Sequence, residues 1–357
     1  MLNKFNYKFL GTILVLLFVK NGISQDSLYY SSAFNQSGSD LKTELYNIIK
    51  GHVQFPYTAS STDVWDILKE TDKDKTNPNN VILIYSNRSV NAAQEYNSAK
   101  GWSREHVWAK SRGDFGTSEG AGTDVHHLRA CDVSINSTRN NRNFDDCKSC
   151  IDVIDNGFKT GSKRDASLWT FEPPDNYKGD VARMIFYMTV RYEGLGGEPD
   201  LELTNTLLAK TDKSPLHSVS QTLLKWSLED TVSVEERLRN EIIYKDYQKN
   251  RNPFIDYPEL SEYLFGDSIG YVWKPEIVLS LEQKKKALFT IYPNPTKRQV
   301  TIEGEFTSLT VFNNAGQVLD LQANERISLE GYPNGSYFFQ ITDNKGFTSV
   351  IKVYKEE

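Results

Sequence analysis

Three of the five histidines lie in one segment of the chain, together with carboxylates, arginines and asparagines. The segment contains REHVW at positions 104–108, DVHHLRACDVSIN at 124–136 and STRNNRNF at 137–144. Carboxylate and amide oxygens are ligands for hard cations such as Mg²⁺, and arginine side chains bind phosphate. Histidine can exchange a proton near neutral pH, because its ordinary pKa is about 6.5. These residue types together indicate an enzyme that acts on phosphate esters.

Hydrolysis of a phosphodiester with one divalent cation requires a base, hard metal ligands, a positive charge beside the phosphate and a proton source. The segment can supply the first three, and we predict that His106 is the base. Its neighbour Glu105 would point to the opposite face if both residues lie on a β-strand. The two side chains could then serve one site only through a bulge, a strand end or a bridging metal ion.

Length and composition predict two ordered domains. A chain of 357 residues is long enough for a catalytic domain and a smaller second one. Hydrophobic residues at 38% and charged residues at 25% are typical of an ordered globular protein and exclude a low-complexity chain.

The formal net charge of −6 provides no overall attraction to nucleic acid. Phosphate binding would therefore need a local basic patch. Between positions 100 and 143 the basic residues do outnumber the acidic ones: Lys100, Arg104, Lys110, Arg112, Arg129, Arg139 and Arg142 against Glu105, Asp114, Glu119, Asp124 and Asp132. The surplus is small, and it falls where the candidate residues lie.

The first 24 residues, positions 1–24, are predicted to form a signal peptide. Lys4 and Lys8 precede an apolar run of about eleven residues, from Phe9 to Val19, which is shorter than the roughly twenty that a membrane-spanning helix needs. No other segment of the sequence has the length and apolar character to span a membrane. Export to an oxidising compartment would allow one structural disulfide. Its partners stay open among Cys131, Cys147 and Cys150.

Apolar periodicity predicts a helix-rich α+β fold for residues 25–266, the candidate catalytic domain. Helical spacing is present in four stretches: 40–52, 179–194, 216–230 and 232–248. A short apolar run at 81–86 predicts a buried strand. Beyond residue 265 the periodicity is lost, and residues 267–286, which end in three lysines, are predicted to form a linker.

The C-terminal segment, residues 287–357, consists of short strand-like runs separated by turn signals. The runs are VTIEG, SLTVFN, SYFFQIT and TSVIKVY, and they predict a small all-β sandwich. The segments IYPNPTKRQVTI and YPNGSYFFQITDNKGFTSVIKVYK resemble the C-terminal sorting domain of the bacterial type IX secretion system. The resemblance implies recognition by that secretion machinery, a secreted or cell-surface protein, and no role in catalysis. An immunoglobulin-like binding module is the alternative.

REHVW, DVHHLR and the spacing NxxRxNxxF, which starts at Asn136, together resemble the secreted bacterial endonuclease I family of ββα-metal, or His-Me finger, nucleases. The resemblance implies a ββα-metal core in which His106 is the general base. Glu105 and Asn136 would bind Mg²⁺, or another divalent cation such as Mn²⁺ or Ca²⁺. Arg139 would stabilise the charge on the phosphate. Arg129 is the second candidate for that role, although relatives commonly carry a small or aromatic residue there.

The expected function is that of a secreted, metal-dependent, non-specific endonuclease that cuts DNA and, as a second substrate, RNA. It would work as a monomer and leave 5′-phosphate ends. Two alternatives stay open. One is a cell-surface protein that binds nucleic acid or glycans without catalysis. The other is a zinc hydrolase whose metal is held by Asp124, His126 and His127, residues for which we otherwise expect a structural role.

Overall fold

The computed structural model describes residues 29–275, 289–314, 317–319, 321–322, 324–342 and 348–356. These residues form two compact units, one from 29 to 275 and one from 289 to 356, each with its own hydrophobic core. The predicted signal peptide, residues 1–24, and residues 276–286 of the predicted linker lie outside the described residues. No helix among the described residues is both long and apolar enough to cross a membrane.

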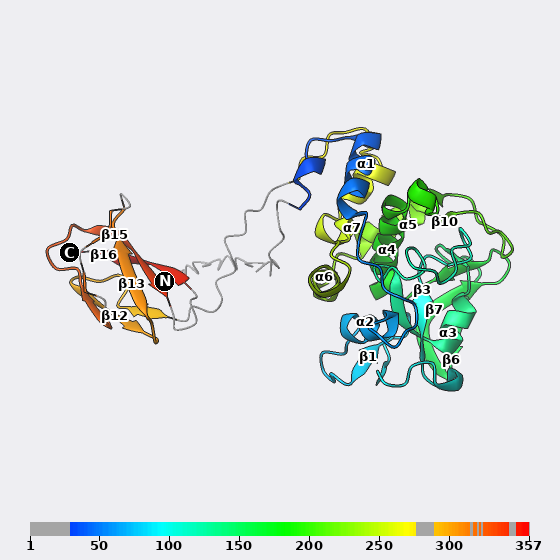
Figure 1. The fold of residues 1–357 in the computed structure, drawn as a ribbon, viewed down its shortest axis with the longest axis horizontal. Coiled ribbons are helices and arrows are strands. Elements are labelled where there is room, and N and C mark those ends of the chain that lie inside the picture. The colour runs from blue at the N-terminus through cyan, green and yellow to red at the C-terminus, as the bar shows by residue number, and fades with distance from the viewer. Residues whose placement is uncertain are drawn as a thin grey trace, which may run out of the picture. The chain divides into compact units, whose positions relative to one another are not determined.

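The first unit mixes helices and strands, as predicted (Figure 1). Its α-helices are α1 (Gly38–Ile49), α2 (Val64–Thr71), α3 (Val133–Arg139), α4 (Lys178–Arg191), α5 (Ser220–Glu229), α6 (Val234–Ile242), α7 (Pro253–Asp256) and α8 (Leu260–Phe265). Its strands are β1 (Asn80–Ile82), β2 (Ser89–Asn91), β3 (Trp102–His106), β4 (Leu128–Asp132), β5 (Asn143–Phe144), β6 (Ile151–Asp155), β7 (Phe158–Asp165), β8 (Thr170–Glu172), β9 (Glu202–Thr204) and β10 (Leu216–Val219).

The helices follow the apolar spacing of the sequence. In α1 the side chains of Leu41, Leu45 and Ile49 recur every four residues and are buried. The α4 helix is buried over residues 179–191 and packs against α1, α5 and α7, so it forms the centre of the unit.

The other two predicted helical stretches correspond to α5 and α6, with two differences. The stretch 216–230 begins as strand β10, which pairs with β9 before α5 starts. The stretch 232–248 continues past α6 as a π-helical segment, η5 (Ile243–Tyr247). Local apolar spacing does not distinguish such segments from α-helix, because β10 and η5 depend on pairing and packing with distant residues.

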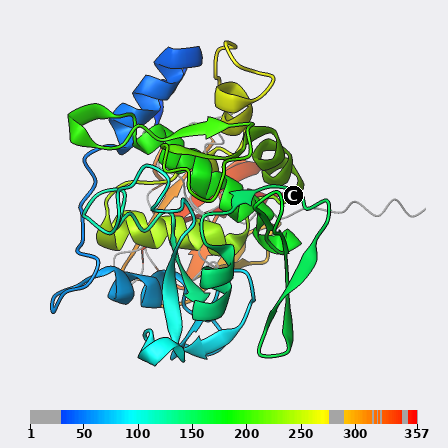
Figure 2. The same ribbon diagram turned by 90° about the vertical axis from the view of Figure 1, so that its right-hand side faces the viewer.

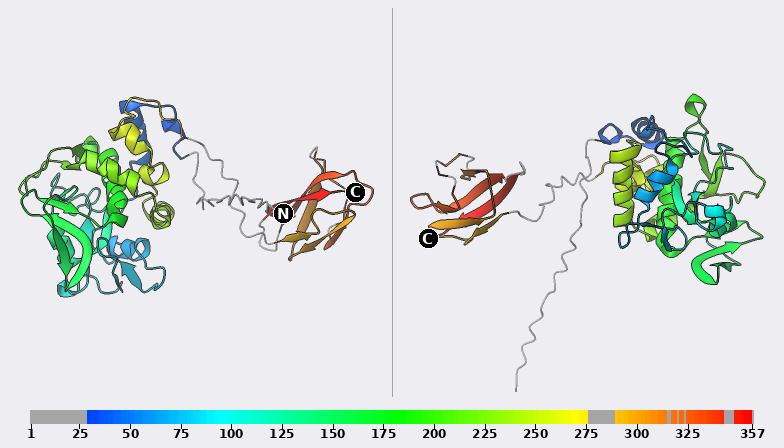
Figure 3. Two further views of the ribbon diagram at one scale, coloured as in Figure 1. Left: turned by 180° about the vertical axis from the view of Figure 1, so that it is seen from behind. Right: turned by 60° about the horizontal axis from the view of Figure 1, so that its bottom comes forward.

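A four-stranded sheet in the order β5-β8-β7-β6 has no counterpart in the sequence-based expectations. Figures 2 and 3 show the β6–β7 hairpin at the edge of the first unit. Polar residues fill much of these strands, and Ile151, Ile154 and Phe158 are exposed, so the apolar pattern is weak. The strand predicted at 81–86 is shorter than expected, since only its start belongs to β1 and Tyr85 adopts a positive φ of 72°.

The elements β3, β4 and α3 form a strand–strand–helix unit around the candidate residues (Figure 1). The strands pair antiparallel, with Glu105 opposite Arg129 and His106 opposite Leu128. The helix begins directly after β4 and packs against both strands. This arrangement brings α3, which carries Asn136, against the strand that ends in His106.

One disulfide joins Cys147 to Cys150, which confirms the prediction of a single disulfide and decides its partners. It closes the short loop between β5 and β6. Cys131 is a free thiol on β4 and is fully buried, so it serves there as a small apolar side chain.

The second unit is a β-sandwich, as predicted (Figure 3). Its described strands form two sheets in the orders β11-β12-β14 and β13-β15-β16. Alternate residues of β15, Tyr337, Phe339 and Ile341, are buried in the core that both sheets share. The strands are β11 (Thr290–Tyr292), β12 (Gln299–Glu303), β13 (Ser308–Phe312), β14 (Arg326–Ser328), β15 (Gly335–Thr342) and β16 (Thr348–Lys355).

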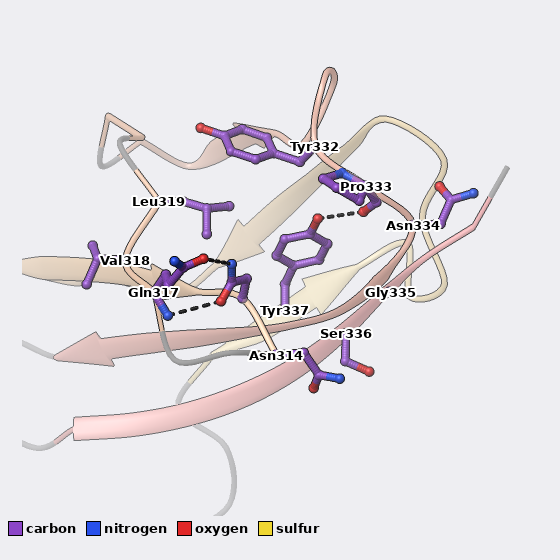
Figure 4. A pocket seen from close by; sticks show the side chains of 11 residues that line it. Asn314, Gln317, Val318, Leu319, Tyr332, Pro333, Asn334, Gly335, Ser336 and Tyr337 are labelled. Atoms are coloured by element: carbon purple, nitrogen blue, oxygen red, sulfur yellow. Dashed lines mark hydrogen bonds between the residues drawn. The ribbon is translucent and has the colours of Figure 1, made fainter.

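A pocket of about 600 Å³ lies in the second unit (Figure 4). Tyr337 lies inside it and donates a hydrogen bond to the carbonyl oxygen of Pro333. The lining contains no histidine, cysteine or carboxylate; it consists of Asn313, Asn314, Gln317, Val318, Leu319 and residues 332–337. The candidate acid–base and metal-binding groups therefore lie in the first unit and not in this pocket.

The first unit extends into the predicted linker. Trp273 is fully buried, and its ring packs against those of Phe34 and Tyr257 with centroids 5.5 and 5.1 Å away. Its backbone is hydrogen-bonded to the segment that precedes α1. The sequence around Trp273 has no periodicity, so the burial of one aromatic anchor was not evident from spacing. Residues 267–275 therefore belong to the folded unit rather than to a linker.

Replacing Trp273 with Ala should lower the free energy of unfolding by about 3–5 kcal/mol, as the loss of a large buried aromatic side chain does. Urea unfolding followed by circular dichroism measures the change. Tyr271→Ala is the control, because Tyr271 is 69% exposed. Its effect should stay within about 0.5 kcal/mol. Equal effects of the two substitutions would show that residues 267–275 are not part of the folded unit.

Candidate functional site

The end of β3 carries the candidate base and one candidate metal ligand. Glu105 and His106 point to opposite faces of the strand, because strand side chains alternate. The carboxylate of Glu105 lies against Tyr85 and Arg139, whereas the ring of His106 lies against Tyr57. His106 is the last residue of β3, so the two faces meet at a strand end. This is one of the three geometries that could let both side chains serve one site.

Glu105 is a buried carboxyl group, with 2% of the residue exposed. Its Oε1 accepts a hydrogen bond from the hydroxyl of Tyr85 at 3.1 Å and lies 3.4 Å from Nε of Arg139. Burial raises the pKa of the carboxyl to about 7, although Arg139 and Tyr85 act to lower it. The partners thus compensate only part of the cost of burying the charge, which favours the binding of a cation at this carboxylate.

Asn136 lies on α3 and turns its side-chain amide toward β3. Its Nδ2 donates to Oγ of Ser103 at 3.1 Å and to the carbonyl oxygen of Arg104 at 3.2 Å. No hydrogen bond from a described residue reaches its Oδ1. Arg139, one turn later on α3, contacts Glu105, so Asn136 and Glu105 border the same interface between α3 and β3. One carboxylate and one amide oxygen are therefore available there as hard ligands.

His106 is held as a neutral imidazole. Its Nε2 lies 3.0 Å from the carbonyl oxygen of Gly122, which can only accept, so Nε2 carries the proton and the lone pair is on Nδ1. Burial lowers the pKa of the imidazole well below its ordinary value, and the charges of His127 and Lys110 act in the same direction. The ring of Tyr57 is stacked on His106, with 5.7 Å between centroids. The side chain is therefore oriented and unprotonated at neutral pH.

The two candidate arginines are buried, and their guanidinium groups face other protein groups. Arg139 is 1% exposed and donates to the carbonyl oxygens of His106, at 3.0 Å, and Val107. Arg129 is 7% exposed and pairs with two buried carboxylates at 2.9 and 3.4 Å. Both guanidinium groups are thus occupied by protein partners.

The residues of the zinc alternative are used in separate contacts. Asp124 is fully buried and accepts hydrogen bonds from three side chains: Tyr187, Tyr192 and Gln248. Nε2 of His126 lies against Asn250, and Nε2 of His127 lies against the carbonyl oxygen of Ala121. Among the described residues, one group of three ligand-type side chains is close enough to share an ion: Cys147, Cys150 and Glu172. Two of its atoms form the disulfide, so the structure offers no support for the zinc alternative.

Three residues outside the sequence cluster complete the surroundings of the candidate groups: Tyr57, Tyr85 and Gly122. No local motif marks the two tyrosines, because each depends on one contact that the fold creates. Gly122 does have a local signal, since it lies in the glycine-rich loop between β3 and β4. A Cβ atom at this position would lie 2.5 Å from the carbonyl oxygen of Ser118, so only glycine fits the loop that presents the carbonyl to His106.

Comparison with known proteins identifies the family of the chain. Residues 37–259 match the family described as Endonuclease I. The chain belongs to the endonuclease I family. An extracellular ribonuclease of Bacillus subtilis (strain 168) is 46% identical over 252 residues, which cover 71% of this chain and 83% of that protein. An extracellular ribonuclease of Bacillus amyloliquefaciens is 49% identical over 234 residues, which cover 66% of this chain and 76% of that protein.

The second unit also matches a known family. Residues 290–356 match the secretion system C-terminal sorting domain. The endonuclease I protein is therefore a nuclease, a phosphodiester hydrolase, that carries a type IX sorting domain and is secreted or displayed on the cell surface. Both families expected from the sequence motifs are confirmed.

The raised pKa of Glu105 predicts that the stability of the protein depends on pH when no divalent cation is present. The carboxyl group of a glutamate in the unfolded chain has a pKa near 4.5, whereas that of Glu105 in the folded state has a pKa of about 7. The stability that this proton contributes is present at low pH and is lost as the pH rises through that window. Relative to Glu105→Gln, which stays neutral, the protein should lose up to about 3 kcal/mol between pH 5 and pH 8.

Urea unfolding of both proteins in excess chelator measures this difference. Glu119→Gln alters an exposed glutamate and should not change the pH dependence. A constant stability difference between Glu105→Gln and the wild type from pH 5 to pH 8 would contradict the raised pKa.

Proposed function

We propose that this nuclease is a divalent-metal-dependent, non-specific endonuclease that hydrolyses RNA and DNA and leaves 5′-phosphate ends. The observation that carries the proposal is the state of His106, which is neutral, fixed by Gly122 and left with its lone pair on Nδ1. His106 is the last residue of β3. Glu105, on the other face of this strand, points toward α3, the helix that carries Asn136. A base and two hard oxygen ligands at one strand end suit the attack of water on a phosphodiester.

His106 would accept the proton of the attacking water at Nδ1. The hydrogen bond from Nε2 to Gly122 keeps the ring in the required tautomer and stabilises the imidazolium that forms when the proton arrives. The stacked ring of Tyr57 restricts the tilt of the imidazole. Because the pKa of His106 is low, the basic form dominates at neutral pH and the proton passes readily to solvent after each turnover.

Glu105 and Asn136 would hold the cation, with Mg²⁺ as the first choice and Mn²⁺ or Ca²⁺ as alternatives. The two residues fit such a cation. One is a buried carboxyl whose protein partners compensate only part of its charge, and the other has an amide oxygen that accepts no hydrogen bond from a described residue. When bound, the cation would neutralise negative charge that develops on the phosphate.

In this proposal Arg139 and Arg129 act by positioning rather than by contact with the phosphate. Arg139 joins α3 to the backbone of His106 and to the carboxylate of Glu105. It would therefore hold the base and the metal ligand in fixed positions relative to each other. Arg129 anchors β4 to buried carboxylates. These roles replace the phosphate contact that the sequence suggested for both residues.

The substrate range follows from the nucleophile. The relatives are named extracellular ribonucleases, which supports RNA as a substrate. Water as the nucleophile does not require the 2′-hydroxyl group, so the same site should also cut DNA. Attack by the 2′-hydroxyl of RNA would instead leave a cyclic phosphate on the sugar. All candidate groups come from one chain, and we propose that the nuclease works as a monomer.

His106→Ala should lower the turnover of RNA and of supercoiled plasmid DNA by about 10²–10⁴-fold in the presence of Mg²⁺, the effect of removing a general base. Gel assays measure the cleavage, and mass spectrometry of the wild-type products should find 5′-phosphate and 3′-hydroxyl ends. An unchanged melting temperature shows that the variant is folded.

Near-normal turnover of His106→Ala would refute the assignment of the base. Cyclic phosphate ends on RNA would refute water as the nucleophile. Binding of nucleic acid by the wild type without any cleavage would support the non-catalytic alternative.

Excess chelator should abolish cleavage, and added Mg²⁺ should restore it. Glu105→Gln and Asn136→Ala should raise the Mg²⁺ concentration for half-maximal activity at least about tenfold, because the first removes the negative charge of a ligand and the second removes an oxygen ligand. Asn136→Asp keeps an oxygen at the same position and should have a smaller effect. Titrations of activity against Mg²⁺ give the midpoints, and undiminished cleavage in chelator would exclude a metal-dependent mechanism.

A further inference from the structure

The basic patch expected from the sequence is mostly buried. Four of its five arginines are at most 7% exposed and bond to carboxylates or backbone carbonyls: Arg112, Arg129, Arg139 and Arg142. Arg104 differs, because it is partly exposed and no carboxylate of a described residue forms an ion pair with it. The strand that ends in the candidate base thus carries one guanidinium that forms no ion pair with a described residue.

Arg104 lies on the same face of β3 as His106, two residues earlier. Its guanidinium carbon is 3.4 Å from the ring centroid of Tyr57 and 4.0 Å from that of Trp65, so two aromatic rings hold it. Tyr57 is also the residue that is stacked on His106. One phenol ring therefore contacts both the guanidinium and the candidate base.

The guanidinium keeps donors for a ligand. It donates to the carbonyl oxygen of Tyr57 and, at 3.0 Å, to Oγ1 of Thr58. Its Nε is buried and has no partner among the described residues. Two of the five N–H donors of the guanidinium are used in these bonds and a third, on Nε, is buried, so the second N–H groups of Nη1 and Nη2 are left for the oxygens of a phosphate.

We propose that Arg104 is the substrate-binding cation of this nuclease and contacts the phosphate next to the one being cut, while Tyr57 fixes its position relative to His106. The proposal rests on the function proposed above. Two residues along a strand span roughly 6.6 Å, which is close to the spacing of neighbouring phosphorus atoms in an extended nucleic acid strand.

Arg104→Gln in the full chain tests the contact with a short RNA and a short DNA oligonucleotide. KM should rise about tenfold or more while kcat changes by less than about threefold, because the lost contact lies outside the reacting phosphate. The slope of log(kcat/KM) against log salt concentration should fall by about one. Arg237→Gln is the matched control, since Arg237 is also partly exposed and donates to a backbone carbonyl, that of Ile255 at 3.2 Å. It should alter neither quantity.

Further variants separate charge from packing. Arg104→Lys keeps the charge and should retain the salt dependence of the wild type. Tyr57→Ala frees both the guanidinium and the imidazole, so it should raise KM and also lower kcat. A purely structural role of Arg104 would change the melting temperature of Arg104→Gln but leave the salt dependence of all these variants unchanged.

Direct binding provides the decisive comparison, because it needs no turnover. In chelator, fluorescence anisotropy should give a dissociation constant about tenfold higher for His106→Ala combined with Arg104→Gln than for His106→Ala alone. Equal binding, with equal KM and salt slope for Arg104→Gln and the wild type, would overturn the proposal. The His106→Ala variant separates this failure from failure of the proposed function, since only the latter would leave His106→Ala active.

Discussion

The buried guanidinium of Arg139 is the interaction on which the candidate site depends. It donates to the backbone of His106 and Val107 just where β3 ends, and it lies 3.4 Å from the carboxylate of Glu105. One side chain from α3 therefore fixes the strand end, the backbone of the candidate base and the candidate metal ligand Glu105 at once. Loss of any partner would leave a buried charge or carbonyl unsatisfied, which costs about 1–3 kcal/mol or more. The strand and the helix are thus held as one unit.

The sequence identified the members of this unit because they are close together along the chain. The resemblance to the endonuclease I motifs singled out Glu105 and Asn136 beside His106, and in the fold all three lie on β3 or against it. Spacing could not tell which cations stay exposed, because a count of basic residues carries no information on burial. The resemblance pointed to Arg139, whose guanidinium faces the protein interior, and gave no reason to consider Arg104.

The same limit applies to the fold. Helix α1 was predictable because its buried face repeats with the helical period, and α4 because its apolar stretch is too long for a strand. The sheet of β5, β8, β7 and β6 was not, because its strands are short or partly exposed and are held by pairing with distant residues. Trp273 and Tyr57 show the extreme case. Each makes its contact through one aromatic ring, and a single residue produces no apolar periodicity in the sequence from which its burial could be predicted.

The distribution of charge also bears on substrate selection. A chain with a net charge of −6 does not attract a polyanion as a whole, and most arginines near the candidate base are occupied inside the protein. In the proposed function, attraction comes from a bound cation and from Arg104, and both act on phosphate groups. Phosphates are the same in every nucleotide, so contacts of this kind position a strand without reading its bases. Cleavage without sequence preference is then a direct consequence of where the protein keeps its positive charge.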